Sequence, residues 1–245
     1  MRRSGQSHIL AIGGGSFRQT RRLGVVEASG LLRYALDLTG QDRPKLGLVA
    51  TAMGDDAPWL LKMYGAFRSW DVEVSHLTVF PMPNVEDPRE WILDQDVIYV
   101  SGGSVANLVA LWRLHGLDEA FEEAWRSGVV LSGQSAGALC WHVGGNTDSF
   151  GPDLRVWAEG LAFLPFSCGV HYNSEPQRRR LLQASVASGE LPEGYAADEG
   201  VGLHYVGQEF IQAVTVDPAG SAYRLERDGE GRVKEFRVEP RLLTP

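Results

Sequence analysis

The chain has 245 residues, of which 44% are hydrophobic and 22% charged, and this composition is typical of a globular protein with one large core. A formal net charge of -8, with Arg178-Arg179-Arg180 as the one compensating basic run, argues against nucleic acid as a partner. Apolar runs are too short for a membrane span or for the centre of a signal peptide, so we expect a cytoplasmic protein that does not bind membranes.

The first two thirds of the chain alternate between two patterns. Continuous apolar runs, typical of strands buried on both faces, occupy residues 8–12, 45–52, 72–80, 97–101 and 129–132. Apolar residues at helical spacing occupy residues 23–38, 58–69, 107–115 and 118–126. The alternation predicts an α/β fold, a three-layer sandwich with a mostly parallel central sheet, in a single domain over residues 1–245.

Two glycine-rich turns follow predicted strands. Gly13-Gly14-Gly15 lacks the G-x-G-x-x-G spacing of a dinucleotide site, so we interpret it as a loop at the carboxyl edge of the sheet. Gly102-Gly103 ends one strand and precedes a helix. It is equally compatible with a simple β-to-α turn and with a turn that places a backbone N–H where a reacting oxygen becomes negative.

The motif G-Q-S-A-G at residues 133–137 is a G-x-S-x-G nucleophile elbow, with Ser135 in the middle. A strand that reverses sharply into a helix leaves no room for β-carbons near the turn, which explains the glycines. The run at 129–132 supplies the strand, and residues 136–142 are expected to begin the helix. The N–H of Ala136, in the first helical turn, can then stabilise an oxyanion above Ser135. A tight strand-helix turn without chemistry is the alternative.

A partner for Ser135 is sought among the six histidines. His171 alone lies at the end of a predicted strand, residues 161–170, that enters a loop in the second half of the chain. A polar loop is expected at 146–157 and a helix from Pro176 to about residue 187. His142 is close to Ser135 in sequence, but we expect it inside the helix after the elbow, pointing away from the nucleophile.

Carboxylates and cysteines complete the survey of reactive groups. Another strand, residues 194–198, ends in Asp198-Glu199-Gly200, and carboxylates at such a position are costly unless exposed or partnered. Asp198 and Glu199 are therefore candidates to orient His171. Cys140 and Cys168 have no partners at disulfide-framework or zinc-ligand spacing, so we expect small buried thiols, no metal and no cofactor.

The tail alternates apolar and polar residues on both sides of a glycine-containing turn, which predicts a β-hairpin over residues 221–238 as an appendage of the domain. Val233 is out of phase, so we place it at a bulge. Tyr223, Leu225, Phe236 and Val238 need a surface to cover them, since an isolated hairpin is marginal in water. We expect a homodimer formed through this hairpin, with capping of the parent sheet's edge as the alternative.

The order of these motifs resembles the peptidase E family, serine peptidases related to cyanophycinases within the class I glutamine amidotransferase-like fold. Its most specific parts here are G-x-S-A-G-A at 133–138, T-D-S-F at 147–150 and H-Y-N-x-E-x-x-R at 171–178. The resemblance implies Ser135 as nucleophile, His171 as base and Glu199 as the third member of a triad. Asp198 is the alternative third member, and Asp148 a weaker one.

A site at the sheet's edge beneath several loops is a pocket, which implies a small peptide as substrate. The N–H groups of Gly103 and Ala136 are expected to hold the oxyanion. Few residues separate His171 from Arg178, whereas relatives that cut after an amino-terminal aspartate have a longer segment there. Arg178 is a candidate to bind a substrate carboxylate, but we expect cleavage of Asp-X dipeptides to be weak. A non-hydrolytic binding or regulatory member of the same fold is the rival hypothesis. Glutamine amidotransfer is disfavoured because it uses cysteine at the elbow.

Overall fold

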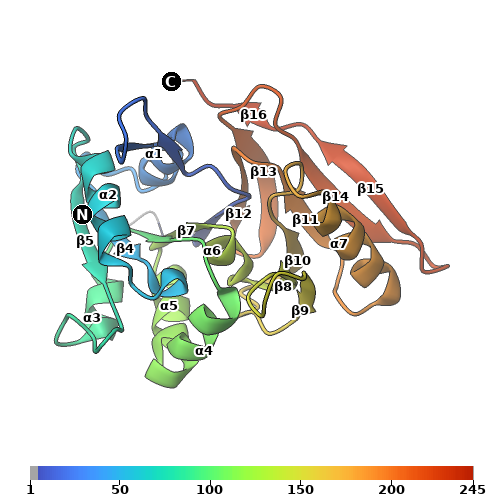
Figure 1. Cartoon of the computed structure of the whole chain (residues 1–245), viewed down its shortest axis with the longest axis horizontal. Helices are drawn as coiled ribbons and strands as arrows, with labels where there is room; N and C mark the ends of the chain where they lie inside the picture. The colour runs from blue at the N-terminus through green and yellow to red at the C-terminus, as the bar shows by residue number, and fades with distance from the viewer. Residues whose placement is uncertain (1–4, 245) are drawn as a thin grey trace.

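A computed structural model describes residues 5–244 of the chain, in which strands and helices alternate through the first half as the sequence predicts (Figure 1). The larger sheet has eight strands in the order β16-β13-β12-β1-β7-β6-β4-β5. Its parallel half consists of β1 His8–Ile12, β4 Lys45–Val49, β5 Glu73–Leu77, β6 Val97–Val100 and β7 Val130–Gln134. Its other strands are β12 Val201–Val206, antiparallel to β1, β13 Glu209–Thr215 and β16 Arg241–Leu242.

A second sheet of six strands has the order β15-β14-β11-β10-β8-β9. Its strands are β8 His142–Thr147, β9 Arg155–Trp157, β10 Leu164–Gly169, β11 Gly194–Ala197, β14 Ala222–Arg227 and β15 Val233–Val238. The three central strands β8, β10 and β11 are mutually parallel, and the flanking strands are antiparallel to their neighbours. The remaining strands, β2 Phe17–Gln19 and β3 Val26–Ala28, form a small hairpin.

Helices follow β4, β5, β6 and β7 of the larger sheet. They are α1 Gly30–Asp37, α2 Ala57–Phe67, α3 Pro88–Leu93, α4 Val105–His115, α5 Leu117–Arg126, α6 Ala136–Leu139 and α7 Pro176–Ser188, with a single 3-10 turn, η1, at Thr51–Met53. Their starts follow ordinary capping chemistry. Asp56, Asp87 and Ser104 each accept a hydrogen bond from the backbone N–H three residues further on, and a proline opens α2, α3 and α7.

The larger sheet is covered by side chains on both faces because each strand sends alternate residues in opposite directions. Leu10 and Ile12 of β1 belong to a core cluster with α1 and α2, whereas Ile9 and Ala11 belong to another with α4, α5 and α6. The second cluster continues to the inner face of the six-stranded sheet, whose outer face packs on α7. The predicted α/β fold with mostly parallel sheets is confirmed.

Three local predictions were wrong. Residues 23–38 are not one helix, since α1 begins only at Gly30 and residues before it pair as the β2–β3 hairpin. Val25 and Val26 favour strand, and Ser29 donates its N–H to the Ser16 carbonyl instead of continuing a helix. The helix after the elbow ends at Leu139, and His142 begins β8. Part of the expected loop at 146–157 therefore belongs to strands β8 and β9.

The tail hairpin forms as predicted but is not a free arm. β14 pairs with β11, so the hairpin continues the six-stranded sheet, and Figure 1 shows α7 lying alongside it. Val233 pairs with Arg227 in register without a bulge. Phe236 lies opposite Arg224 and is 47% exposed, whereas Glu235 faces α7 and accepts hydrogen bonds from Tyr172 and Gln183. The homodimer stays a prediction.

Burial of His142 makes the stability depend on pH. Its side chain is fully buried, its Nδ1–H donates to the Ala138 carbonyl at 2.8 Å, and burial lowers its pKa to about 4. The unfolded chain, with an ordinary pKa near 6.5, binds the extra proton first. Stability is therefore full above pH 6.5 and declines as the pH falls toward 4, by about 2 kcal/mol at pH 5 from this one residue.

We predict that His142→Gln reduces the loss of unfolding free energy between pH 7 and pH 5 by about 2 kcal/mol, measured by urea denaturation at both pH values. The exposed His115 gives a matched control, His115→Gln, which removes a histidine that is not buried. An unchanged pH dependence in His142→Gln would show that burial does not lower the pKa of this imidazole.

Candidate active site

Ser135 lies on the sharp turn between β7 and α6, with backbone angles φ 51° and ψ -111° that non-glycine residues rarely adopt. Gly133 and Gly137 allow backbone segments to pack closely at this turn. A β-carbon on Gly133 would lie 2.5 Å from the Gly137 carbonyl oxygen, and one on Gly137 would lie 2.2 Å from that of Val100. The N–H of Ser135 donates to the carbonyl of Ile12 at 3.1 Å. The elbow is therefore a packed feature that presents the serine at the carboxyl edge of the sheet.

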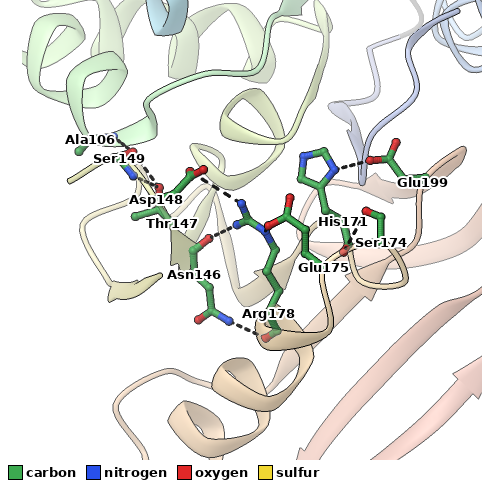
Figure 2. Close-up of polar contacts among 10 residues, drawn as sticks. All are labelled: Ala106, Asn146, Thr147, Asp148, Ser149, His171, Ser174, Glu175, Arg178 and Glu199. Atoms are coloured by element: carbon green, nitrogen blue, oxygen red, sulfur yellow. Dashed lines mark hydrogen bonds and ion pairs between the residues drawn. The ribbon is translucent and has the colours of Figure 1, made fainter. Parts of the chain in front are cut away.

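His171 follows β10 and also has a left-handed backbone, φ 53°. Its N–H donates to the Gly13 carbonyl at 3.0 Å, and its ring Nδ1 donates to Glu199 Oε1 at 2.5 Å (Figure 2). The backbone N–H of Glu199 in turn donates to the side-chain oxygen of Asn173 at 3.0 Å. The imidazole is thus held in the tautomer that leaves Nε2 as the basic nitrogen.

Ser135 and His171 line one pocket of about 350 Å³. The other lining residues are Gly103, Ser104, Asp148, Ser149, Glu175 and Arg178. Within residues 5–244 no hydrogen bond joins Ser135 Oγ to the imidazole. Such contacts are commonly loose in a free enzyme and tighten when substrate binds.

The three carboxylates considered from the sequence have different partners. Glu199 alone among them contacts the His171 ring. Asp198 is buried, accepts the N–H of Ser221 at 3.0 Å, and has a pKa raised by burial. Asp148 lies at the opposite side of the pocket, where its carboxylate is 3.7 Å from the guanidinium of Arg178.

Arg178 lies beneath the pocket with its side chain only 5% exposed. Its guanidinium is engaged on several sides: Nε donates to Glu175 at 2.7 Å, and Nη1 donates to the Asn146 carbonyl at 3.0 Å. Figure 2 shows the side chain reaching between Glu175 and Asp148. Two carboxylates therefore already surround the cation that the sequence suggests for a substrate carboxylate.

The turn at Gly102-Gly103 approaches the elbow closely. A β-carbon on Gly102 would lie 3.3 Å from the β-carbon of Ser135, and one on Gly103, whose φ is 134°, would lie 2.3 Å from the Ala52 carbonyl oxygen. Ala136 begins α6 directly after the serine. The two N–H groups proposed for the oxyanion thus belong to residues on neighbouring strand ends, β6 and β7.

The contact of Gly13-Gly14-Gly15 with the candidate catalytic residues was not predicted from the sequence. A β-carbon on Gly14 would lie 2.3 Å from Glu199 Oε2, and the Gly14 carbonyl accepts the N–H of Gly200 at 3.0 Å. The loop thus presses against the acid as well as the histidine segment. The available signal was three glycines directly after β1, the strand that neighbours β7 in the sheet.

The other reactive groups lie apart from this pocket. His8 and His204 bond to each other at 3.0 Å, and burial lowers the pKa of both. Cys140 and Cys168 are buried thiols with raised pKa values. Residues 5–244 contain no group of side chains arranged to hold a metal ion. In the same range, none of the helices is both long and apolar enough to span a membrane.

An α/β fold that presents a serine on a strand-helix elbow beside a histidine and a carboxylate has the architecture of a serine hydrolase. Comparison with known proteins identifies a family within the class of serine hydrolases. The family described as Peptidase family S51 matches residues 9–213. The protein named uncharacterized peptidase YgaJ, from Bacillus subtilis (strain 168), is 37% identical over 217 residues, 89% of this chain and 91% of that protein.

Two crystal structures share the fold. One, titled as a peptidase E protein from Listeria monocytogenes EGD-e, gives a TM-score of 0.61 at 16% identity and covers 86% of this chain and 100% of that chain. The other, a peptidase from an acI-B1 Actinobacterium, gives 0.65 at 19% identity and covers 96% and 95%. The chain belongs to peptidase family S51 and is a serine peptidase, which confirms the resemblance to peptidase E.

The close approach at Gly14 yields a prediction. Gly14→Ala places a methyl group where the Glu199 carboxylate lies, so the acid must rotate away from His171 while the sheet stays intact. We expect peptidase kcat/KM to fall about 100-fold with little change in the urea midpoint. The control is Gly229→Ala in the open β14–β15 turn, where an added methyl contacts nothing. Wild-type activity in Gly14→Ala would contradict the proposed role of this loop.

Proposed function

We propose that this protein hydrolyses short peptides with a Ser135–His171–Glu199 triad. The observation that carries the proposal is the hydrogen bond from His171 Nδ1 to Glu199 Oε1, made at the wall of the pocket that Ser135 also lines. An elbow serine without a base is a weak nucleophile. A histidine held by a carboxylate, with its other nitrogen unengaged, is what such a serine requires.

The reaction follows from these positions. His171 Nε2 removes the proton of Ser135, whose Oγ attacks the peptide carbonyl to form a tetrahedral intermediate. Glu199 stabilises the imidazolium that results. The N–H groups of Ala136 and Gly103 receive the oxyanion, and the imidazolium then protonates the leaving amine. Water, activated by the same histidine, hydrolyses the acyl-enzyme and restores Ser135.

The size of the pocket favours small substrates. Loops at the ends of β6, β7 and β10 and the start of α7 enclose about 350 Å³ around the serine, which is space for a few residues of peptide. The walls carry one cation and two anions, Arg178 with Asp148 and Glu175. A short peptide fits this volume, whereas a folded protein does not.

The choice of Glu199 over its neighbour is tested by a matched pair of substitutions. Glu199→Gln should lower kcat by about 10⁴-fold, because the amide can present the wrong tautomer of His171 to Ser135. Asp198→Asn should stay close to the wild-type rate, because Asp198 bonds to Ser221 and not to the histidine. Ser135→Ala supplies the background rate. Equal losses in the two carboxylate variants would reject the assignment of Glu199.

Specificity for amino-terminal aspartate should be weak, as the short segment after His171 predicts. The guanidinium of Arg178 is already bound by Glu175, Asn146 and Asp148, so little of its charge is left for a substrate carboxylate. We expect Asp-Leu to be cleaved no faster than Ala-Leu by the wild type, measured as kcat/KM with Ser135→Ala as background. A large preference for Asp-Leu would mean that Arg178 releases its partners when substrate binds.

A further inference from the structure

A second pocket, of about 360 Å³, opens beside the catalytic one and has a different chemistry. It is lined by Thr51, Ala52, Gly54, Phe80, Asn107, Ala110 and Leu111. No charged side chain contributes to this lining, whereas the catalytic pocket has three. Phe80 supplies a large apolar wall and is 48% exposed, so the pocket is reachable from solvent.

Ser104 connects the walls of the two pockets. Ser104 lines the catalytic pocket, and its N–H donates to the carbonyl of Ala52 at 2.9 Å. Its hydroxyl caps α4 by accepting the N–H of Asn107 at 3.2 Å. Ala52 and Asn107 are both part of the second lining, so the walls of the two pockets are in direct contact.

The order and spacing of the strands set the direction and the distance from Ser135 to the second pocket. Ser135 follows β7, and the second pocket lies between α4, which follows β6, and the segments that follow β4 and β5, in a sheet whose order there is β7-β6-β4-β5. Parallel strands lie about 4.8 Å apart, so β4 ends about 10 Å along the edge from the nucleophile. An extended peptide covers that distance in about three residues.

We propose that this pocket is a substrate subsite, which takes the apolar side chain of a peptide residue about three positions from the bond that Ser135 attacks. The inference rests on the proposed function of the catalytic pocket. Its volume accommodates a Leu or Phe side chain, and its lack of charged walls excludes an unpaired Asp or Lys. The preferred substrates are then apolar peptides of about four or more residues, because a dipeptide held at Ser135 ends before it reaches the subsite.

The test uses labelling of Ser135 by a fluorophosphonate, whose initial rate falls when a peptide occupies the site. Four matched tetrapeptides compete: Ala-Ala-Ala-Leu, Ala-Ala-Ala-Ser and the same pair with the variable residue at the amino end. Burial of one leucine side chain corresponds to about 10- to 100-fold in affinity. We therefore expect the Leu peptide of one pair to compete about 10- to 100-fold better than its Ser counterpart.

Ala110→Phe fills the subsite from an exposed position of α4 and should reduce this Leu preference to about twofold or less, as removal of the buried area requires. Leu114→Phe places the same aromatic side chain one turn along the helix, outside the lining, and should keep the wild-type preference. Labelling of both variants by the small probe alone should equal that of the wild type, since neither residue lines the catalytic pocket.

Different outcomes would reject the proposed function and the subsite. If the wild-type Ser135 is not labelled at all, the proposed function itself is wrong. If Ser135 is labelled but Leu and Ser peptides compete equally, or Ala110→Phe keeps the Leu preference, the subsite is rejected and the catalytic proposal stands. A change of oligomeric state in Ala110→Phe with unaltered peptide preference would assign this pocket to an interface between copies of the chain and overturn the subsite.

Discussion

Three consecutive backbone carbonyls at the end of β1 hold the candidate active site together. The carbonyl of Ile12 accepts the N–H of Ser135, that of Gly13 the N–H of His171, and that of Gly14 the N–H of Gly200. Segments that are far apart in the chain are thereby fixed against one rigid strand in the middle of the sheet. The hydrogen bond between His171 and Glu199 is made above this anchor, and it depends on Gly14 having no side chain.

The same anchor explains how an unfavourable backbone is maintained. Ser135 and His171 both have positive φ, which costs about 1–3 kcal/mol for each residue. Each is held by a hydrogen bond from its own N–H to β1 and by close packing of neighbouring glycines. Strain of this kind persists where the surroundings determine the conformation several times over. Here it is located at the two residues that would transfer the proton.

Much of this could be predicted from the sequence because it is local. Apolar runs predicted the strands of the parallel half, and the elbow motif predicted where a serine would be exposed. The β2–β3 hairpin was missed because Leu31, Tyr34 and Ala35 set up a helical spacing that extends by chance into the preceding valines. Phe236 was expected to be covered but is 47% exposed, because it lies opposite Arg224 on β15, the edge strand of its sheet.

The contacts that define the site join residues far apart in the chain, so local sequence patterns do not predict them. Asp198 and Glu199 are adjacent, so periodicity shows only that they point to opposite sides, and the packing of β11 against β14 decides which one meets His171. Likewise, a run of three glycines does not indicate that the carboxylate of Glu199 packs against it. Only the resemblance to peptidase E favoured Glu199.

Proton NMR of the imidazole reports whether Glu199 orients His171 for proton transfer from Ser135. A short N–H to carboxylate hydrogen bond should give one ring N–H resonance far downfield of the amides, slow to exchange with water. We predict that this resonance belongs to His171, disappears in Glu199→Gln and persists in Asp198→Asn. A wild-type spectrum without this resonance, or a resonance that survives in Glu199→Gln, would show that Glu199 does not orient His171.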